Sequence, residues 1–315
     1  MRVLVVGAGA IGSVLGGFLA KAGHDVTLLG RAWHLDVVKR QGLNITGLWG
    51  EHVVRLATVT AREEFADATP FDWVFVCVKA HQTAEVAEWL PAVIAPQTCL
   101  CAFQNGLGNY ETLSRVVAPE RVALGRVIFG VELQPGVVRV TVCADDVLIG
   151  AIDPRFPREQ VVALAATLQE SGVPARATAS ILTDLWAKVL YNCALNGLST
   201  VLEVSYGRLL KHPAAVRIME AVIEEAYRAA DARHIALKPA TAQAYRELLF
   251  GRLIPDTAAH QSSMLQDVRR GKPTEIESLN GAIVRLAAEA GLAAPMNALV
   301  TRLVHAKERF AGAGG

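Results

Sequence analysis

The sequence predicts an α/β protein in which an N-terminal Rossmann-type, doubly wound parallel sheet precedes a second, all-helical domain. Three observations support this fold. At the N-terminus an apolar strand runs straight into a glycine-rich turn and a helix. Strand-like and helical runs then alternate as far as about residue 179, which is typical of a parallel sheet with crossover helices. From residue 180 onward the apolar residues recur with helical spacing. We therefore expect two domains, residues 1–179 and residues 180–315.

The first strand, residues 2–6, leads into a turn with the spacing of a dinucleotide-binding site, Gly7-x-Gly9-x-x-Gly12. Gly7 permits a tight turn, Gly9 lets the backbone approach a pyrophosphate, and Gly12 lets the following helix pack against the strand. The strand before the turn and the helix after it favour this interpretation over a glycine-rich turn without a ligand. The expected cofactor contacts are Gly7, Gly9, Ala10, Ile11 and Gly12.

The second strand, residues 25–29, is followed by Gly30 and Arg31 rather than by an acidic residue. A carboxylate at this place would hydrogen-bond a free ribose 2′-hydroxyl, whereas a guanidinium can pair with a 2′-phosphate through two charge-assisted bonds. Arg31 therefore favours NADP(H) over NAD(H). An ordinary solvated arginine is the alternative.

The remaining strand-like runs of the first domain cover residues 73–78 and 98–103, and then residues 122–131 and 137–141 on either side of Gln134-Pro135-Gly136, which predicts a hairpin turn. A strand at residues 147–149, a helix at residues 158–171 and a strand at residues 173–177 complete the domain. The second domain is predicted to contain helices at residues 181–204, 214–232, 239–250, 262–270, 274–289 and 297–310.

Composition excludes several classes of partner. The chain is 52% hydrophobic and 19% charged with a net charge of +1, and it has no basic stretch interleaved with aromatic residues, so we expect no nucleic-acid partner. No stretch is long and apolar enough to predict a membrane span, and the N-terminal apolar run is better explained as the first strand than as a secretory signal.

The cysteines and histidines do not predict a metal site. The five cysteines are scattered through apolar runs, and Cys99 and Cys101 are expected on one face of a strand as small core residues. The eight histidines form no recognisable ligand cluster. A reduced, cytoplasmic protein without a metal is the expectation.

Polar residues directly follow two of the predicted strands. Lys79 and Gln82 come after residues 73–78, and Gln104-Asn105-Gly106 comes after residues 98–103. Ligands of open α/β sheets bind beyond the carboxyl ends of the strands, so Lys79 and Asn105 are expected to reach the nicotinamide ribose or a substrate oxygen. The alternative for residues 104–106 is a turn that merely tolerates positive φ.

A polar stripe marks the first helix of the second domain. Lys188, Asn192 and Asn196 recur every four residues and so share one helix face, while the rest of the helix is largely apolar. Burying an amide without a hydrogen bond costs about 1–3 kcal/mol, so a polar stripe on so apolar a helix must find partners or water. A cleft-lining stripe is the better explanation, because the opposite side of the helix has enough apolar residues to be core. A solvated stripe on a surface helix is the alternative.

A third polar segment contains Ser263 and Glu275. Thr274 and Glu277 have the spacing of a capping box, so Glu277 is expected to be structural. Glu275 remains unassigned by this pattern. It is either a site residue or a carboxylate that favours the helix dipole.

Taken together, the motifs GAGAIG, Arg31, VKAHQ, QNGLG, the stripe on the helix, SSMLQD and TEIESLNG resemble ketopantoate reductase over nearly the whole chain and in the same order. The resemblance implies NADPH-dependent reduction of the C2 ketone of 2-dehydropantoate to (R)-pantoate, on the route to pantothenate and coenzyme A. Hydride transfer to a ketone leaves charge on its oxygen, so the site needs a proton donor there.

By the same resemblance, each matched position has an expected role. Lys188 looks like the catalytic lysine and general acid, and Glu275 looks like its acidic partner. The expected substrate ligands are Asn105, Asn192, Asn196 and Ser263, and the expected cofactor neighbours are Lys79, Gln82 and Asn105. One departure concerns the substrate: His260 stands where the family commonly has an asparagine.

Two other functions compete with this one. A paralogous NADP-dependent reductase would act on another 2-keto or hydroxy acid, and His260 leaves room for it. A non-catalytic NADP(H) sensor would not need Lys188 in a polar stripe. Apolar faces on the C-terminal helices also make a homodimer an expectation.

Overall fold

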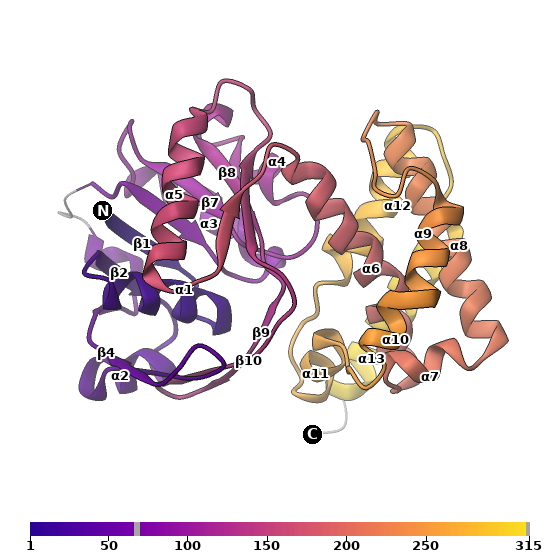
Figure 1. Ribbon diagram of the computed structural model, residues 1–315, viewed down its shortest axis with the longest axis horizontal. Coiled ribbons are helices and arrows are strands. Elements are labelled where there is room, and N and C mark those ends of the chain that lie inside the picture. Colours follow the sequence, from indigo (N-terminus) through magenta and orange to yellow (C-terminus); the bar gives the residue numbers. More distant parts are fainter. Residues whose placement is uncertain (66–69, 313–315) are drawn as a thin grey trace. The chain divides into compact units, whose positions relative to one another are not determined.

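The computed structural model describes residues 1–65 and 70–312, so residues 313–315 of the predicted second domain lie outside it. The chain divides into two compact units (Figure 1). Unit 1 comprises Met1–Gln104 and Asn109–Ile181, and unit 2 comprises Asn105–Gly108 and Leu182–Gly315. Each unit encloses a hydrophobic core of its own.

Unit 1 is built on a large sheet whose eight strands, among the described residues, follow the order β12-β11-β8-β7-β6-β1-β2-β5. The strands are β1 (Arg2–Val6), β2 (Asp25–Leu29), β5 (Ala57–Val59), β6 (Trp73–Val76), β7 (Cys99–Ala102), β8 (Val122–Arg126), β11 (Val147–Ala151) and β12 (Ala175–Ala177). All neighbours are parallel except β8 and β11. Val3, Leu4 and Val5 are completely buried, as expected of a central strand covered on both faces. The predicted parallel α/β sheet is confirmed.

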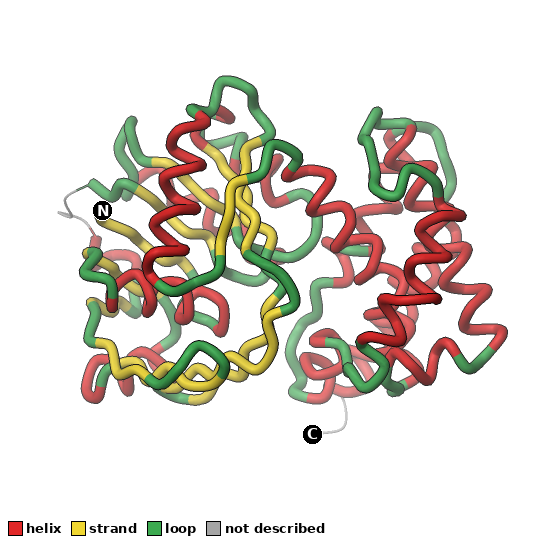
Figure 2. Tube along the Cα trace, in the orientation of Figure 1, coloured by secondary structure: helices red, strands yellow, loops and turns green. Residues whose placement is uncertain are grey.

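Helices alternate with the strands of this sheet along the chain and pack against it (Figure 2). They are α1 (Ala10–Lys21), α2 (Ala32–Gln41), α3 (Thr83–Trp89), α4 (Asn109–Leu113) and α5 (Arg158–Ser171), with short 3-10 turns η1 (Arg62–Phe65), η2 (Ala80–Gln82), η3 (Leu90–Ala92) and η4 (Pro119–Arg121). The helix predicted at residues 158–171 is confirmed to the residue. Cys99 and Cys101 lie together in the core beneath these helices, as predicted.

A second, smaller sheet in unit 1 was not predicted. Its order is β4-β3-β10-β9, with β3 (Leu43–Gly47), β4 (His52–Val54), β9 (Phe129–Gln134) and β10 (Val137–Cys143). The predicted hairpin joins β9 to β10, and Gly136 in its turn has a φ of +73°. The run at residues 122–131, however, is not one strand. It breaks after Arg126, because β8 belongs to the large sheet and β9 to the small one.

Unit 2 is helical. Its elements are α6 (Ile181–Leu202), α7 (Tyr206–Leu210), α8 (Pro213–Asp231), α9 (Ala242–Leu248), the π-helical turn η5 (Leu249–Leu253), α10 (Ile254–Asp256), α11 (Ser263–Arg269), the 3-10 turn η6 (Ile276–Ser278), α12 (Asn280–Glu289) and α13 (Pro295–Gly312). α7 was not predicted. The helix predicted from residue 239 begins at Ala242 instead, after the Thr241 hydroxyl, which accepts a hydrogen bond from the Ala244 N–H.

A buried carboxylate fixes the beginning of α13. Glu225 on α8 is 5% exposed and accepts hydrogen bonds from the backbone N–H groups of Met296 and Asn297, at 2.8 and 2.9 Å. The Asn297 side-chain amide also donates to it, at 2.8 Å. A negative charge at a helix N-terminus is favourable, and this contact joins α8 to α13 in the core of unit 2.

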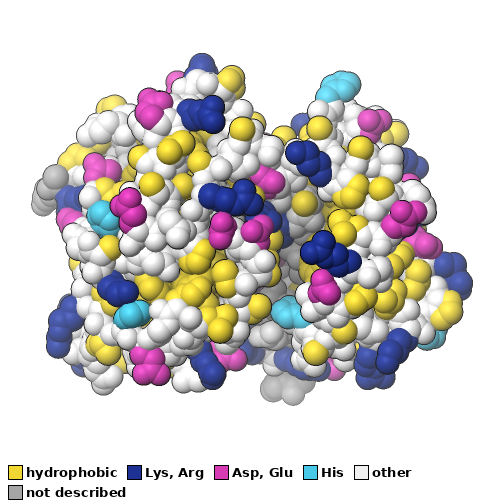
Figure 3. All heavy atoms as spheres, in the orientation of Figure 1, with side chains coloured by type: hydrophobic (Ala, Val, Ile, Leu, Met, Phe, Trp, Pro, Cys, Tyr) yellow, Lys and Arg dark blue, Asp and Glu magenta, His cyan; other side chains and the backbone are white. Residues whose placement is uncertain are grey.

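The surface carries both signs of charge. On the face that Figure 3 shows, Lys and Arg side chains are interspersed with Asp and Glu side chains. Among the described residues, no helix combines the length and apolar character needed to cross a bilayer.

Candidate active site

The glycine-rich turn follows β1 in unit 1 and opens α1. A Cβ atom on Gly7, whose φ is +101°, would lie 2.6 Å from the Val78 nitrogen, and one on Gly12 would lie 2.3 Å from the Gly7 oxygen. Both positions therefore require glycine for packing. Gly9 differs, because a Cβ there would have nothing within 4 Å. The turn thus keeps an open approach at Gly9 and at the start of α1, whose first turn has no acidic side chain to oppose an anion.

The other predicted cofactor residues of unit 1 follow neighbouring strands. Arg31 comes after β2 and stands exposed at the start of α2, while Lys79 and Gln82 come after β6 and are half-buried. Because β2, β1 and β6 are parallel neighbours, all of these residues lie beyond the same carboxyl edge as the glycine turn. This is the edge at which open α/β sheets bind nucleotides.

The polar stripe on α6 is partly buried. Asn196 is 5% exposed, and Lys188 and Asn192 are half-buried, while Val189 and Cys193 on the other faces belong to the core. The polar side of the helix is therefore largely buried at Asn196 and partly exposed at Lys188 and Asn192. Its amides and its ammonium group need partners or a ligand there.

One side-chain amide connects the two predicted catalytic residues. The Lys188 ammonium donates a hydrogen bond to Asn105 Oδ1 at 2.5 Å, and Asn105 Nδ2 donates to Glu275 Oε2 at 3.0 Å. Asn105 lies 83 residues before Lys188 and 170 residues before Glu275 in the chain. The three side chains nevertheless form one continuous series of hydrogen bonds within unit 2, which we call the relay. The lysine and the carboxylate that the resemblance paired are thus bridged by Asn105.

The conformation of the QNGLG segment brings Asn105 to this place. Gly106 has a φ of +82°, and the backbone N–H of Leu107 donates to the Ser278 oxygen at 2.8 Å. A Cβ on Gly106 would lie only 2.3 Å from that same oxygen. The positive φ that the alternative interpretation required is thus present at Gly106, and the turn holds Asn105 against the segment that carries Glu275. Gln104 stays in unit 1, where its Nε2 donates to Thr83 Oγ1 at 2.6 Å.

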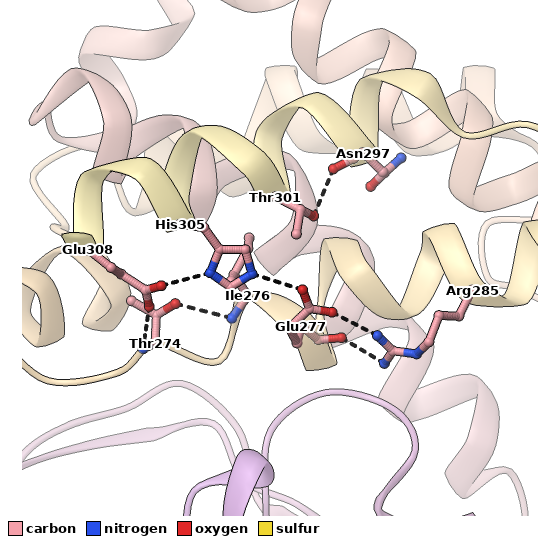
Figure 4. Close-up of polar contacts among 8 residues, drawn as sticks. All are labelled: Thr274, Ile276, Glu277, Arg285, Asn297, Thr301, His305 and Glu308. Atoms are coloured by element: carbon pink, nitrogen blue, oxygen red, sulfur yellow. Dashed lines mark hydrogen bonds and ion pairs between the residues drawn. The ribbon is translucent and has the colours of Figure 1, made fainter. Parts of the chain in front are cut away.

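The segment that carries Glu275 is held by α13 and α12 (Figure 4). The Thr274 N–H donates to a carboxylate oxygen of Glu308 at 2.7 Å, and the Glu277 carboxylate contacts His305 Nε2 and accepts a hydrogen bond from Arg285, each at 2.8 Å. Glu275 itself lies between these anchors and is 8% exposed.

The predicted capping box at this segment is wrong. The Thr274 hydroxyl accepts from the Ile276 N–H at 3.3 Å rather than from Glu277, and Glu308 takes the place of the reciprocal carboxylate. The cause is a break in the helix: a 3-10 turn covers Ile276–Ser278, and α12 begins only at Asn280. Glu277 is structural, as expected, but through its contacts with His305 and Arg285.

The His305 imidazole predicts a pH dependence of stability. Its hydrogen bond to Glu277, reinforced by Glu308, raises the pKa of His305 above the usual value of 6.5. A raised folded-state pKa stabilises the protein fully below the unfolded-state pKa, and the contribution is lost as the pH rises through the folded-state pKa. The free energy of unfolding of the His305→Gln variant should therefore be lower than that of the parent at about pH 5 and nearly equal to it at about pH 9. Because the His305 side chain is 41% exposed, the loss should stay below about 1 kcal/mol. Urea unfolding of both proteins at several pH values measures this difference, and a difference that does not vary with pH contradicts the assignment.

A pocket of about 220 Å³, including its part open to solvent, adjoins the relay within unit 2. It is lined by Asn105, Asn192, Asn196, Ser263, Met264, Asp267, Glu275 and Leu279. All four predicted substrate ligands and Glu275 line the pocket. Lys188 is not a lining residue, but it is hydrogen-bonded to Asn105, which is.

Three of the lining residues were not predicted from the sequence. Asp267 stands four residues after Ser263 on α11, so a search for polar side chains at helical spacing would have found it. Met264 and Leu279 are buried apolar residues that no polar pattern marks. They give the pocket one apolar side.

The loop before α11 contains His260. The Ser262 hydroxyl caps α11 by accepting a hydrogen bond from the Leu265 N–H at 3.1 Å, which leaves Ser263 at the pocket. The His260 ring packs beside the Tyr206 ring, with 5.1 Å between centroids, and desolvation lowers the pKa of His260. His260 is not one of the lining residues.

Comparison with known proteins agrees with the predicted resemblance. The model of the family "Ketopantoate reductase PanE/ApbA" matches residues 3–154, and that of its C-terminal domain matches residues 180–308. A 2-dehydropantoate 2-reductase of Aquifex aeolicus is 38% identical over 313 residues, which covers 98% of each chain.

Two solved structures are similar over 99% of each chain. A PanE/ApbA family ketopantoate reductase from Ralstonia eutropha has a TM-score of 0.88 at 30% identity, and a D-mandelate dehydrogenase with NADH and anilino(oxo)acetate has a TM-score of 0.86 at 28% identity. The predicted fold and family are confirmed. With a fold, a pocket and a full-length relative in agreement, the chain belongs to the ketopantoate reductase family and is an oxidoreductase of that type.

Proposed function

We propose that this protein reduces the C2 ketone of 2-dehydropantoate to (R)-pantoate with NADPH. The observation that carries the proposal is the relay from Lys188 through Asn105 to Glu275 beside a small polar pocket. In this proposal residues 1–179 hold the cofactor, and residues 180–315 together with Asn105 supply the substrate pocket, with Lys188 as the general acid. NADPH, when bound, supplies the hydride that forms the new C–H bond at C2.

Lys188 acts as the general acid. As hydride reaches C2, the carbonyl π electrons move to the oxygen, and the Lys188 ammonium gives that oxygen its proton. Its hydrogen bond to Asn105 directs the ammonium group toward the pocket before the reaction. The buried Glu275 carboxylate compensates the positive charge through the Asn105 amide.

The remaining polar groups of the pocket position the substrate. The amides of Asn192 and Asn196 and the Ser263 hydroxyl can hydrogen-bond a carboxylate and a hydroxyl group. The Asp267 carboxylate also lines the pocket and is 9% exposed. Its charge repels a second carboxylate on the substrate but accepts a hydrogen bond from a hydroxyl, which favours a hydroxylated 2-keto acid over a dicarboxylic one.

Arg31 is proposed to select NADPH by pairing with the 2′-phosphate. It is exposed at the start of α2, and no described residue forms an ion pair with it. The Arg31→Ala variant should bind NADPH about 10- to 100-fold more weakly, because a charge-assisted pair is lost, and NADH about as well as the parent. Fluorescence titration with both cofactors measures this ratio. Arg40→Ala, which removes another exposed arginine from α2, is the matched control. Equal losses of NADPH and NADH affinity in Arg31→Ala would show that Arg31 does not contact the 2′-phosphate.

We also propose that the protein is a cytoplasmic homodimer. Leu299, Leu303 and Phe310 on α13 are 47%, 42% and 78% exposed, and such apolar residues favour association with a second copy. Sedimentation velocity across a range of concentrations tests this directly, and a monomer at all of them excludes the dimer.

The assay for the proposed function is steady-state oxidation of NADPH with 2-dehydropantoate beside a panel of other 2-keto acids, with NADH as the control cofactor. A clear preference for 2-dehydropantoate with NADPH is expected. His260 and the similar D-mandelate dehydrogenase favour a second candidate, a reductase of another 2-keto acid. Turnover of another 2-keto acid but not of 2-dehydropantoate, or a preference for NADH over NADPH, would support this second candidate.

A further inference from the structure

The Asn196 amide can take two orientations, and the orientation determines whether its oxygen or its NH₂ group faces the pocket. A carboxamide has an acceptor end and a donor end of nearly the same shape, and only the NH₂ end can bind a carboxylate or carbonyl oxygen. Asn192, one turn earlier on the same helix face, has no hydrogen bond that fixes its amide among residues 1–65 and 70–312. Asn196 does have one, and its partner determines which end faces the pocket.

That partner is Tyr206, the first residue of α7. Its hydroxyl donates a hydrogen bond to Asn196 Oδ1 at 2.6 Å. No described atom accepts a hydrogen bond from Nδ2 at the other end of the amide, and this atom is not fully enclosed by protein. Burial raises the pKa of Tyr206 well above its usual range, so the phenol keeps its proton and remains a donor. A phenol can also accept, but Oδ1 is the one acceptor that the described residues offer to the Tyr206 O–H, so this donation holds Oδ1 toward Tyr206 and leaves the NH₂ group for a ligand.

The Tyr206 side chain has no freedom to turn away. It is 2% exposed and lies edge-on to Tyr191, with ring centroids 5.7 Å apart and planes at 81°. On its other side it packs beside the His260 ring, and its backbone N–H donates to the His260 oxygen at 3.1 Å. Tyr206 therefore also joins α6 to the loop that leads to Ser263.

We propose that Tyr206 is a positioning residue for substrate binding, which fixes the Asn196 amide with its NH₂ group toward the pocket so that it binds an oxygen of the anionic keto acid. This inference rests on the proposed function, because it takes a 2-keto acid as the occupant of the pocket. It assigns a role to a residue that lies outside the pocket lining and outside the polar motifs of the sequence. A tyrosine whose hydroxyl merely satisfied its own burial would have no effect on the ligand.

The test is the Tyr206→Phe variant, which keeps the packed ring and removes only the hydroxyl. KM for the keto acid should rise about tenfold, the equivalent of one neutral hydrogen bond, with kcat and the NADPH dissociation constant within about twofold of the parent. Tyr191→Phe is the matched control. It removes a phenol that is hydrogen-bonded to Thr257 at 2.7 Å, and its KM should stay unchanged.

A double-mutant cycle separates positioning from a general structural effect. In an Asn196→Ala background there is no amide to orient, so adding Tyr206→Phe should not raise KM further. An unchanged KM in Tyr206→Phe, or the same rise with and without Asn196, overturns the inference while the proposed function stands.

A binding measurement keeps the two proposals distinguishable if the parent protein turns over none of the keto acids. Calorimetric titration with oxamate, an unreactive 2-oxo carboxylate, should then show about tenfold weaker binding to Tyr206→Phe than to the parent. Equal binding to both, or no binding to the parent, overturns the inference as well.

Discussion

The Lys188→Ala variant is expected to lose about 10³-fold in kcat and to keep its NADPH affinity. General acid catalysis typically contributes 10²- to 10⁴-fold, and the ammonium also neutralises the charge that develops on the ketone oxygen. NADPH binding should remain within about twofold, because the glycine turn and Arg31 belong to unit 1 and Lys188 to unit 2. Single-turnover oxidation of bound NADPH, followed by absorbance, measures the chemical step directly.

Lys307→Ala is the matched control for this variant. Lys307 is a partly buried lysine of unit 2 whose ammonium pairs with Glu203 at 2.6 Å, and it does not line the pocket. Its replacement should leave kcat within about twofold. If the Lys188→Ala protein retains more than about a tenth of the parental kcat, Lys188 is not the general acid. The interpretation as a non-catalytic NADP(H) sensor would then be favoured.

The relay was only partly predictable from the sequence. Helical spacing placed Lys188, Asn192 and Asn196 on one face, since a helix repeats its faces locally. Asn105 was expected near the cofactor and substrate, but no local pattern could show that it bridges Lys188 and Glu275. That bridge depends on a contact 170 residues away in the chain, which spacing rules do not reach.

The errors in the predicted fold have the same physical origin. β10 falls in the predicted run at residues 137–141, but its partner β3 was not predicted. The two strands lie far apart in the sequence, and local periodicity does not reveal such a pairing. The capping box at Thr274 failed because Glu308, on another helix, competes successfully for the same N–H group. Local patterns predicted the local elements, and long-range hydrogen bonds decided the rest.

The Gly106→Ala variant should lose more than about 100-fold in kcat/KM, although the substitution adds only one methyl group. The new Cβ would lie 2.3 Å from the Ser278 oxygen and 2.6 Å from the Ser278 Cβ, so the segment must move away. Asn105 is the preceding residue, and its two hydrogen bonds hold the relay together. A displacement of about 1 Å in a catalytic group can cost about 100-fold in rate.

Gly108→Ala separates this displacement from the strain of the backbone. Gly108 has a φ of +95° in the same segment, but a Cβ there would have nothing within 4 Å. Both variants therefore accept a left-handed conformation, which costs about 1–2 kcal/mol, and only Gly106→Ala adds the collision. Gly108→Ala should keep kcat/KM within about fivefold and should lower Tm less than Gly106→Ala does, because only Gly106→Ala adds the collision to the backbone strain. Equal kinetic losses would mean that backbone strain alone impairs the enzyme. A larger loss for Gly106→Ala, with NADPH binding intact, would instead show that the contact with Ser278 sets the position of Asn105, and with it the geometry of proton transfer from Lys188.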